Sequence, residues 1–272
     1  MLKFKASFYN LPKKVQNYIL DSILKVEEIS NIKVVSAVLF GSIVNQDFSK
    51  TSDVDLIIIL EDIGDLKLRK IKRAMRKIEC EYGLAHLAEC NFLNWIKECT
   101  GMYSSNFICT RSDFISANFI KIFNTNRLLT ILLAPTEIVL SNFILNAKTI
   151  YGNDLIPLFR KPSITKMQIF KSFIMNLLLS ISAIVIYPIT PDSTKYSMEA
   201  IKWSLHSVYH YSTSASSSTE KLIEEFSDKS YLLKTQLIQF KKLRNQYKKD
   251  FKFNLKTPIV VWRLHSQYLL KW

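Results

Sequence analysis

Hydrophobic positions along the chain follow two patterns, one typical of helices and one typical of strands. The helical pattern dominates in the second half of the chain. The first segment with a helical period follows Pro12, where Val15, Ile19 and Ile23 are spaced by four residues. This spacing places the three side chains on one face of an amphipathic helix. A second helix is predicted over residues 64–83, which end at a glycine.

Two short apolar runs between these helices have the length and composition of β-strands. Residues 33–40 contain three valines, and residues 53–60 are apolar at every position after two aspartates. A run without polar alternation is typical of a central strand that is buried on both faces. A third strand is expected over residues 84–93, whereas the stretch from Cys99 to Ala147 has no clear pattern.

A turn-rich segment ends the first half of the chain. Gly152, Asn153 and Asp154 are adjacent, and residues of these types favour turns over regular structure. We place the boundary shortly after this cluster. The expected domains are therefore residues 1–160 and residues 161–272.

The segment after residue 163 has an almost continuous helical pattern. A long apolar helix begins it, and four more helices are predicted, the last starting at Pro258. The most apolar run, Phe173 to Ile189, is too short to span a bilayer, so we expect a buried helix. The predicted fold class is α+β/α, with a small mixed-sheet domain followed by an all-helical bundle.

Composition and charge narrow the class of protein further. The chain has 272 residues and is 48% hydrophobic, which is enough to bury a full core. Its 37 basic and 23 acidic residues leave a net charge of +14. Such an excess favours nucleotides, nucleic acid or an acidic protein as partners, although a generally lysine-rich composition explains it equally well. The basic runs at residues 67–77 and 241–252 have the pattern of solvated helix faces.

The cellular location is expected to be the cytoplasm, without membrane association. The N-terminal residues lack the apolar core of a signal peptide. The four cysteines form no C-x-x-C pair and have no zinc-ligand spacing, so reduced thiols are the simplest interpretation.

The clearest chemistry lies in the stretch LFGSIVNQDFSKTSDVDLIIIL, residues 39–60, which joins the two central strands. Gly41 and Ser42 follow the first strand, and Asp53 and Asp55 open the second. Because side chains alternate along a strand, the two aspartates point to the same face. Paired carboxylates suit Mg²⁺, which also binds phosphate oxygens, while the glycine and serine can approach and hold a phosphate. These residues predict a site for a metal-bound triphosphate.

A Gly-Ser pair, ten residues and Asp-x-Asp resemble the signature of the DNA polymerase beta-like nucleotidyltransferase superfamily, in its minimal and antibiotic-modifying branches. The second half is similar to the helical domain of aminoglycoside adenylyltransferases, with Glu199-Ala200 and Trp203-Ser204-Leu205 at matching positions. The resemblance implies transfer of a nucleoside monophosphate from a nucleoside triphosphate, with ATP as the expected donor, to an acceptor hydroxyl. Mg²⁺ would assist, and pyrophosphate would be released.

The resemblance also implies a third acidic group on the neighbouring strand, which completes the metal site or accepts the proton of the acceptor. Glu89 is the best-placed carboxylate, whereas an alignment anchored on Trp95 puts His86 there instead. These two residues are three apart and face opposite ways on a regular strand, so only one can join the site. The predicted catalytic residues are Asp53, Asp55 and Glu89, with Asp53 and Asp55 as metal ligands and Gly41 and Ser42 as nucleotide-binding residues.

Two functions follow from this reading. The first is a Mg²⁺-dependent nucleotidyltransferase, whose acceptor is a small hydroxylated molecule, a protein or RNA. The second is a catalytically degenerate protein, antitoxin-like, that binds nucleotide or RNA in a regulatory role. A third carboxylate beside the aspartates favours catalysis, whereas His86 at that position favours the degenerate site. The sequence leaves the acceptor, the base preference and the oligomeric state open.

Overall fold

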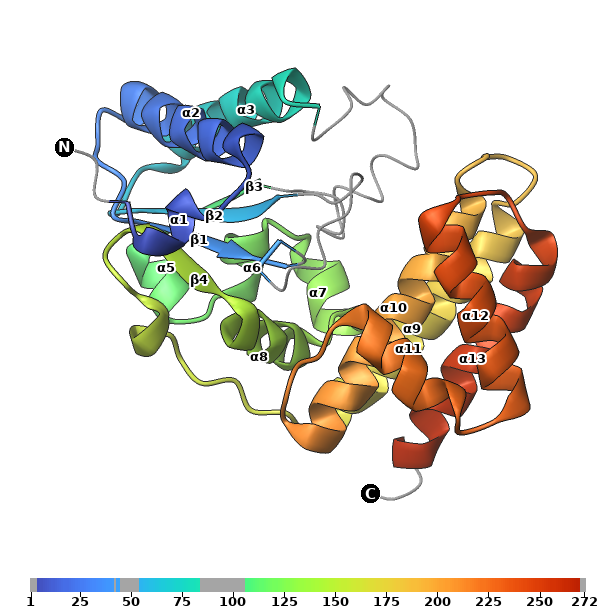
Figure 1. The fold of residues 1–272 in the computed structure, drawn as a ribbon. Helices are drawn as coiled ribbons and strands as arrows, with labels where there is room; N and C mark the ends of the chain where they lie inside the picture. Colours follow the sequence, from blue (N-terminus) through green and yellow to red (C-terminus); the bar gives the residue numbers. More distant parts are fainter. Residues whose placement is uncertain (1–3, 42, 45–53, 84–105, 270–272) are drawn as a thin grey trace. The chain divides into compact units, whose positions relative to one another are not determined.

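The chain divides into two compact units (Figure 1). Contacts group residues 131–142 with the segment after residue 163, whereas the sequence pattern assigned residues 1–160 to one domain. The first unit comprises residues 1–130 and 143–162, and the second comprises residues 131–142 and 163–272. The structure, a computed structural model, describes residues 4–41, 43–44, 54–83 and 106–269.

The first unit is built on a four-stranded mixed sheet with the strand order β3-β2-β1-β4. Strand β1 is antiparallel to β2 and β4, and β2 is parallel to β3. The strands span Ser36–Phe40 (β1), Asp55–Leu60 (β2), Asn106–Thr110 (β3) and Lys148–Gly152 (β4). The predicted mixed sheet is therefore confirmed.

Strands β3 and β4 lie where the sequence pattern predicted no strand. β3 falls in the stretch without a clear period, and β4 overlaps the turn-rich cluster before the expected boundary. Both pair with strands that are distant in sequence, so long-range hydrogen bonding decides their conformation. The strand expected over residues 84–93 lies outside the described residues.

Helices cover both faces of this sheet. The long helices α2 and α3 lie together over one face, and α5 and α6 lie on the other side (Figure 1). Helices α7 and α8 contain residues of both units. The helices are α1 (Ala6–Tyr9), α2 (Lys13–Ser30), α3 (Asp65–Glu81), α5 (Arg111–Ile115), α6 (Phe119–Phe123), α7 (Arg127–Leu133) and α8 (Thr136–Asn146), with a short 3₁₀ turn at Ile156–Leu158.

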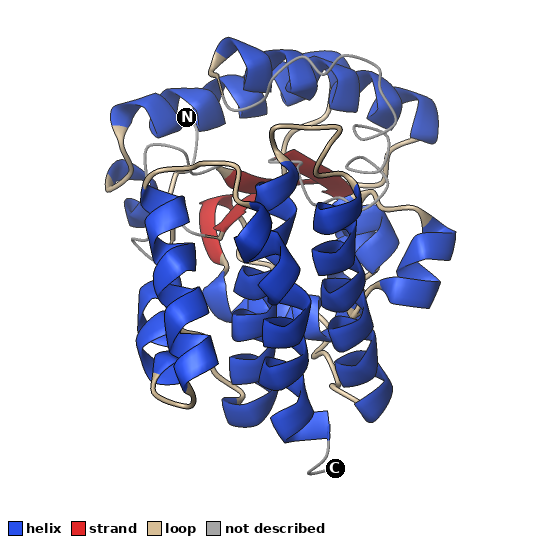
Figure 2. Cartoon of the chain, turned by 90° about the vertical axis from the view of Figure 1, so that its right-hand side faces the viewer, coloured by secondary structure: helices blue, strands red, loops and turns tan. Residues whose placement is uncertain are grey.

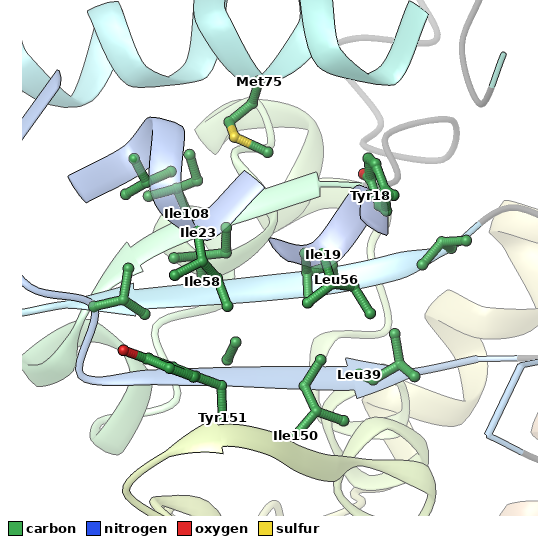
Figure 3. Close-up of a cluster of buried hydrophobic side chains, with 14 of the residues drawn as sticks. Tyr18, Ile19, Ile23, Leu39, Leu56, Ile58, Met75, Ile108, Ile150 and Tyr151 are labelled. Atoms are coloured by element: carbon green, nitrogen blue, oxygen red, sulfur yellow. The ribbon is translucent and has the colours of Figure 1, made fainter. Parts of the chain in front are cut away.

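Strand β2 is buried on both faces, as its continuous apolar run predicts. Leu56 and Ile58 point toward α2 and α3, where they join a core that contains Ile23 and Met75 (Figure 3). The residues between them, such as Ile57, point to the opposite face. There, phenylalanine rings from several elements contact one another: Phe40, Phe107, Phe114, Phe123, Phe143 and Phe159.

The second unit is an all-helical bundle, as predicted. Its long helices lie side by side in Figure 2, and their apolar faces form a separate core. The helices are α9 (Lys166–Val185), α10 (Ser193–Thr213), α11 (Thr219–Ser227), α12 (Tyr231–Asn245) and α13 (Phe251–Leu269).

The last helix begins earlier than the sequence pattern predicts. Pro258 was expected to open this helix because proline is favoured in a first turn. Instead, α13 starts at Phe251 and contains Pro258 in its interior. Asp250 explains this start, since its carboxylate accepts a hydrogen bond from the N–H of Phe253 at 3.0 Å and so caps the helix.

Helix α9 has the length and apolar composition of a membrane-crossing helix, but only part of its surface is exposed. In the structure, 33% of its most apolar window is buried. Phe173 and Ala183 lie in the interior beside α10 and α13, whereas Phe170 and Val185 are exposed. The run was expected to be too short to span a bilayer, and this is wrong for α9, which extends over 20 residues; the expectation of a buried helix holds for one face of α9 only.

Buried histidines make the second unit sensitive to acid. His265 is fully buried, and its Nδ1 lies 3.0 Å from the hydroxyl of Tyr211. Burial lowers the pKa of His265 to about 3, because the charged imidazolium would lose its hydration. Burial likewise lowers the pKa of His210. Below pH 6.5 these two imidazoles bind protons in the unfolded chain but stay neutral in the folded chain. Their contribution to the free energy of unfolding therefore falls as the pH falls below 6.5.

We expect the substitution His265→Gln to flatten this pH dependence. Each proton that only the unfolded state binds changes the free energy of unfolding by about 1.4 kcal/mol per pH unit. Urea unfolding of the wild-type protein and of His265→Gln at pH 7, 6 and 5 measures the difference in slope. Equal slopes for the two proteins would contradict a neutral, buried imidazole at this position.

Candidate functional site

The candidate site lies where β1 ends and β2 begins. Phe40 is directly opposite Asp55 in the antiparallel pair, and Gly41 follows immediately. Opposite residues of an antiparallel pair point to the same face, so the carboxylate of Asp55 lies on the face of Phe40 and Ile57. The hairpin thus brings the glycine of the motif next to its second aspartate.

The structure gives a steric reason for glycine at position 41. Gly41 has a φ of +77°, in the left-handed region that side chains rarely adopt. A Cβ atom at this position would lie only 2.1 Å from Oδ2 of Asp55. The missing side chain therefore leaves the space that the Asp55 carboxylate occupies. The sequence analysis assigned Gly41 to phosphate binding, and the contact with Asp55 is an additional role that only the structure reveals.

The remaining predicted site residues lie outside the described residues. These are Ser42, Asp53, Glu89 and the alternative His86. Within the part of the chain that the structure describes, no group of three or more His, Cys, Asp or Glu side chains is placed to hold a metal ion. Among the described residues, Asp55 is the one predicted metal ligand, and its carboxylate occupies the space beside the bare backbone of Gly41.

Strand β3 lies next to β2, and a third acidic group was expected on the strand that neighbours the two aspartates. Its residues, NFICT from Asn106 to Thr110, include no carboxylate. Asn106 is aligned with Leu56, one residue from Asp55. Its side-chain amide is shielded from solvent and has no hydrogen-bond partner among the described residues. Any carboxylate that completes the site must therefore come from another segment.

Lys148 is a candidate that the sequence analysis missed. It opens β4 and pairs with Leu39, so it lies at the same end of the sheet as Gly41, on the face opposite to that of Asp55. Its side chain is exposed and carries a positive charge that can attract phosphate. No local motif marks this lysine, because its position depends on the long-range pairing of β4 with β1.

Comparisons with known proteins bear on the family and the fold. Residues 22–100 match the family model described as polymerase beta, nucleotidyltransferase. The fold is similar to the crystal structure of the spectinomycin adenyltransferase AAD(9) from Enterococcus faecialis with ATP and spectinomycin, with a TM-score of 0.57. That similarity covers 94% of this chain and 100% of that chain at 14% sequence identity, so it concerns the fold. No curated protein matches the sequence.

We expect the substitution Gly41→Ala to weaken binding of Mg²⁺–ATP at least about tenfold, or ~1.4 kcal/mol. The new methyl group would force the Asp55 carboxylate out of its position. Isothermal titration calorimetry measures the affinity. Gly83→Ala is the matched control, since Gly83 has a similar φ of +66° but no heavy atom within 4 Å of an added Cβ. Equal affinities for the two variants would show that the space at Gly41 is not needed for binding.

Proposed function

We propose that this protein transfers a nucleoside monophosphate from a nucleoside triphosphate to an acceptor hydroxyl, because residues 22–100 match the polymerase beta nucleotidyltransferase family model. The observation that carries the proposal is the contact between Gly41 and Asp55 inside this segment. It brings the Gly41 half and the Asp55 half of the motif, which are proposed to bind phosphate and metal, together at one end of the sheet. ATP is the proposed donor, in line with the nucleotide bound to the similar adenyltransferase structure.

In the proposed reaction, the acceptor oxygen attacks the α-phosphorus and the bond to the β-phosphate oxygen breaks, so pyrophosphate leaves. Asp53 and Asp55 would hold Mg²⁺, which neutralises the phosphates and orients the attacking group. Gly41 and Ser42 would contact the triphosphate. Glu89 would accept the proton of the acceptor hydroxyl, and His86 is the alternative base.

The acceptor is proposed to be a small hydroxylated molecule, a protein or RNA. The similar structure contains spectinomycin, which supports a small acceptor. The acidic residues of the helical unit that would attract a polycationic antibiotic are partly neutralised. Glu220 lies 2.7 Å from Lys241 and 3.4 Å from Arg244, and Glu199 lies 3.2 Å from Lys202. A strongly cationic acceptor is therefore less favourable than a neutral or anionic one.

A degenerate, non-catalytic protein is the second candidate. The described residues of β3 bring no carboxylate beside Asp55, so the choice between the two candidates depends on whether Glu89 joins the site. A degenerate protein would bind nucleotide or RNA without turnover. Both candidates are proposed to work in the cytoplasm, where nucleoside triphosphates are available.

The substitution Asp55→Asn is expected to reduce transfer at least about 10³-fold, or ~4 kcal/mol, because it removes a charged metal ligand. The assay follows label from α-³²P-labelled ATP, CTP, GTP or UTP into pools of tRNA, protein and aminoglycosides, with and without Mg²⁺. Asp62→Asn is the matched control at the other end of β2. Asp62 accepts a hydrogen bond from Ser112 at 2.9 Å, which asparagine can retain.

One outcome would count against the enzyme, and another against the role of Asp55. Tight nucleotide binding without transfer in any pool would favour the degenerate protein. Equal activity of the Asp55→Asn and Asp62→Asn variants would show that Asp55 is not part of the active site.

A further inference from the structure

Helix α3 carries an unusual concentration of positive charge. Seven of the eleven residues from Lys67 to Lys77 are basic, and none is acidic. All seven side chains except Lys72 are exposed. Like charges three and four residues apart on a helix repel each other, by about 0.2–0.5 kcal/mol per pair. This repulsion is a cost that binding of a polyanion would relieve.

The acidic groups of the neighbouring helix α2 do not pair with the exposed residues Arg69, Lys70, Arg73 and Lys77. The acidic residues of α2, which lies beside α3, have other partners. Asp21 accepts a hydrogen bond from the hydroxyl of Tyr82, Glu27 accepts one from the N–H of Val34, and Glu28 pairs with Lys25. Among the described residues, no ion pair involves Arg69, Lys70, Arg73 or Lys77, which we call the α3 basic stripe.

The apolar side of α3 is already occupied. Ile71, Met75 and Ile78 are buried in the core of the first unit. Leu66, in the first turn, is the exposed large apolar side chain on α3 among those that the structure describes. An amphipathic helix binds a membrane through a free apolar face, and stable protein interfaces depend on buried apolar anchors. The outer face of α3 offers neither, so a ligand that presents regularly spaced negative charges fits it best.

We propose that the α3 basic stripe binds the phosphate backbone of nucleic acid, independently of the transfer reaction. From Arg69 to Lys77 the helix advances about 12 Å, at 1.5 Å per residue. One strand of a duplex presents a phosphate about every 3.4 Å along its axis, so the stripe faces three to four phosphates. Arg69 and Arg73 can each bind a phosphate through two N–H groups, and this backbone contact carries no sequence preference.

Fluorescence anisotropy with a labelled 20-base-pair RNA duplex, and with a DNA duplex of the same length, tests the proposal on the full chain. The stripe variant replaces Arg69, Lys70, Arg73 and Lys77 with glutamine. The control replaces four exposed lysines of the helical unit, Lys242, Lys248, Lys252 and Lys256, and has the same net charge. We expect the stripe variant to bind at least tenfold more weakly, with a salt dependence shallower by about 3 in log–log slope. The control should bind like the wild-type protein.

Three results would overturn the proposal. The first is no binding of either nucleic acid by the wild-type protein, and the second is an equal loss in both variants, which would indicate attraction to net charge alone. The third is displacement of the RNA by poly-glutamate as effectively as by unlabelled RNA, which would point to an acidic protein. Asp55→Asn should keep full affinity, so a failed transfer assay and a failed binding assay are separate results.

Discussion

The antiparallel pairing of β1 with β2 determines where the candidate site of this protein lies. It sets Phe40 opposite Asp55 and brings the backbone of Gly41 against the carboxylate. Only glycine leaves room for that carboxylate and adopts the backbone conformation at the end of the strand without strain. The rest of the first unit holds this geometry in place, because β2 is buried between α2 and α3 on one face and a cluster of phenylalanines on the other.

The two faces of the sheet differ in the residues that cover them. The face that carries Asp55 is lined by phenylalanine rings, which stabilise the sheet without adding charge near the site. The opposite face binds α2 and α3, and the outer surface of α3 carries the basic stripe. The Asp55 carboxylate and the cationic surface of α3 therefore lie on opposite faces of the sheet. The positions of the basic residues on the surface therefore say more about possible anionic partners than the net charge of +14 does.

Local patterns in the sequence were sufficient for the elements that carry their own signal. The four-residue spacing of Val15, Ile19 and Ile23 identifies α2, and the unbroken apolar run after Asp55 identifies a central strand. The almost continuous helical pattern after residue 163 identifies the helical bundle of the second unit. The start of α13 was missed because Asp250 caps the helix ahead of Pro258, and a proline inside a helix is uncommon.

By itself, the sequence determined the mixed-sheet and helical classes, the position of the Gly-Ser and Asp-x-Asp motif, and the family to which the motif points. These depend on short-range periodicity and on residues close together in the chain. Only the tertiary structure decided that β3 and β4 complete the sheet, that Lys148 lies at the site end, and that residues 131–142 group with the helical unit. Each of these features depends on hydrogen bonds or packing between segments distant in sequence, for which no local pattern exists.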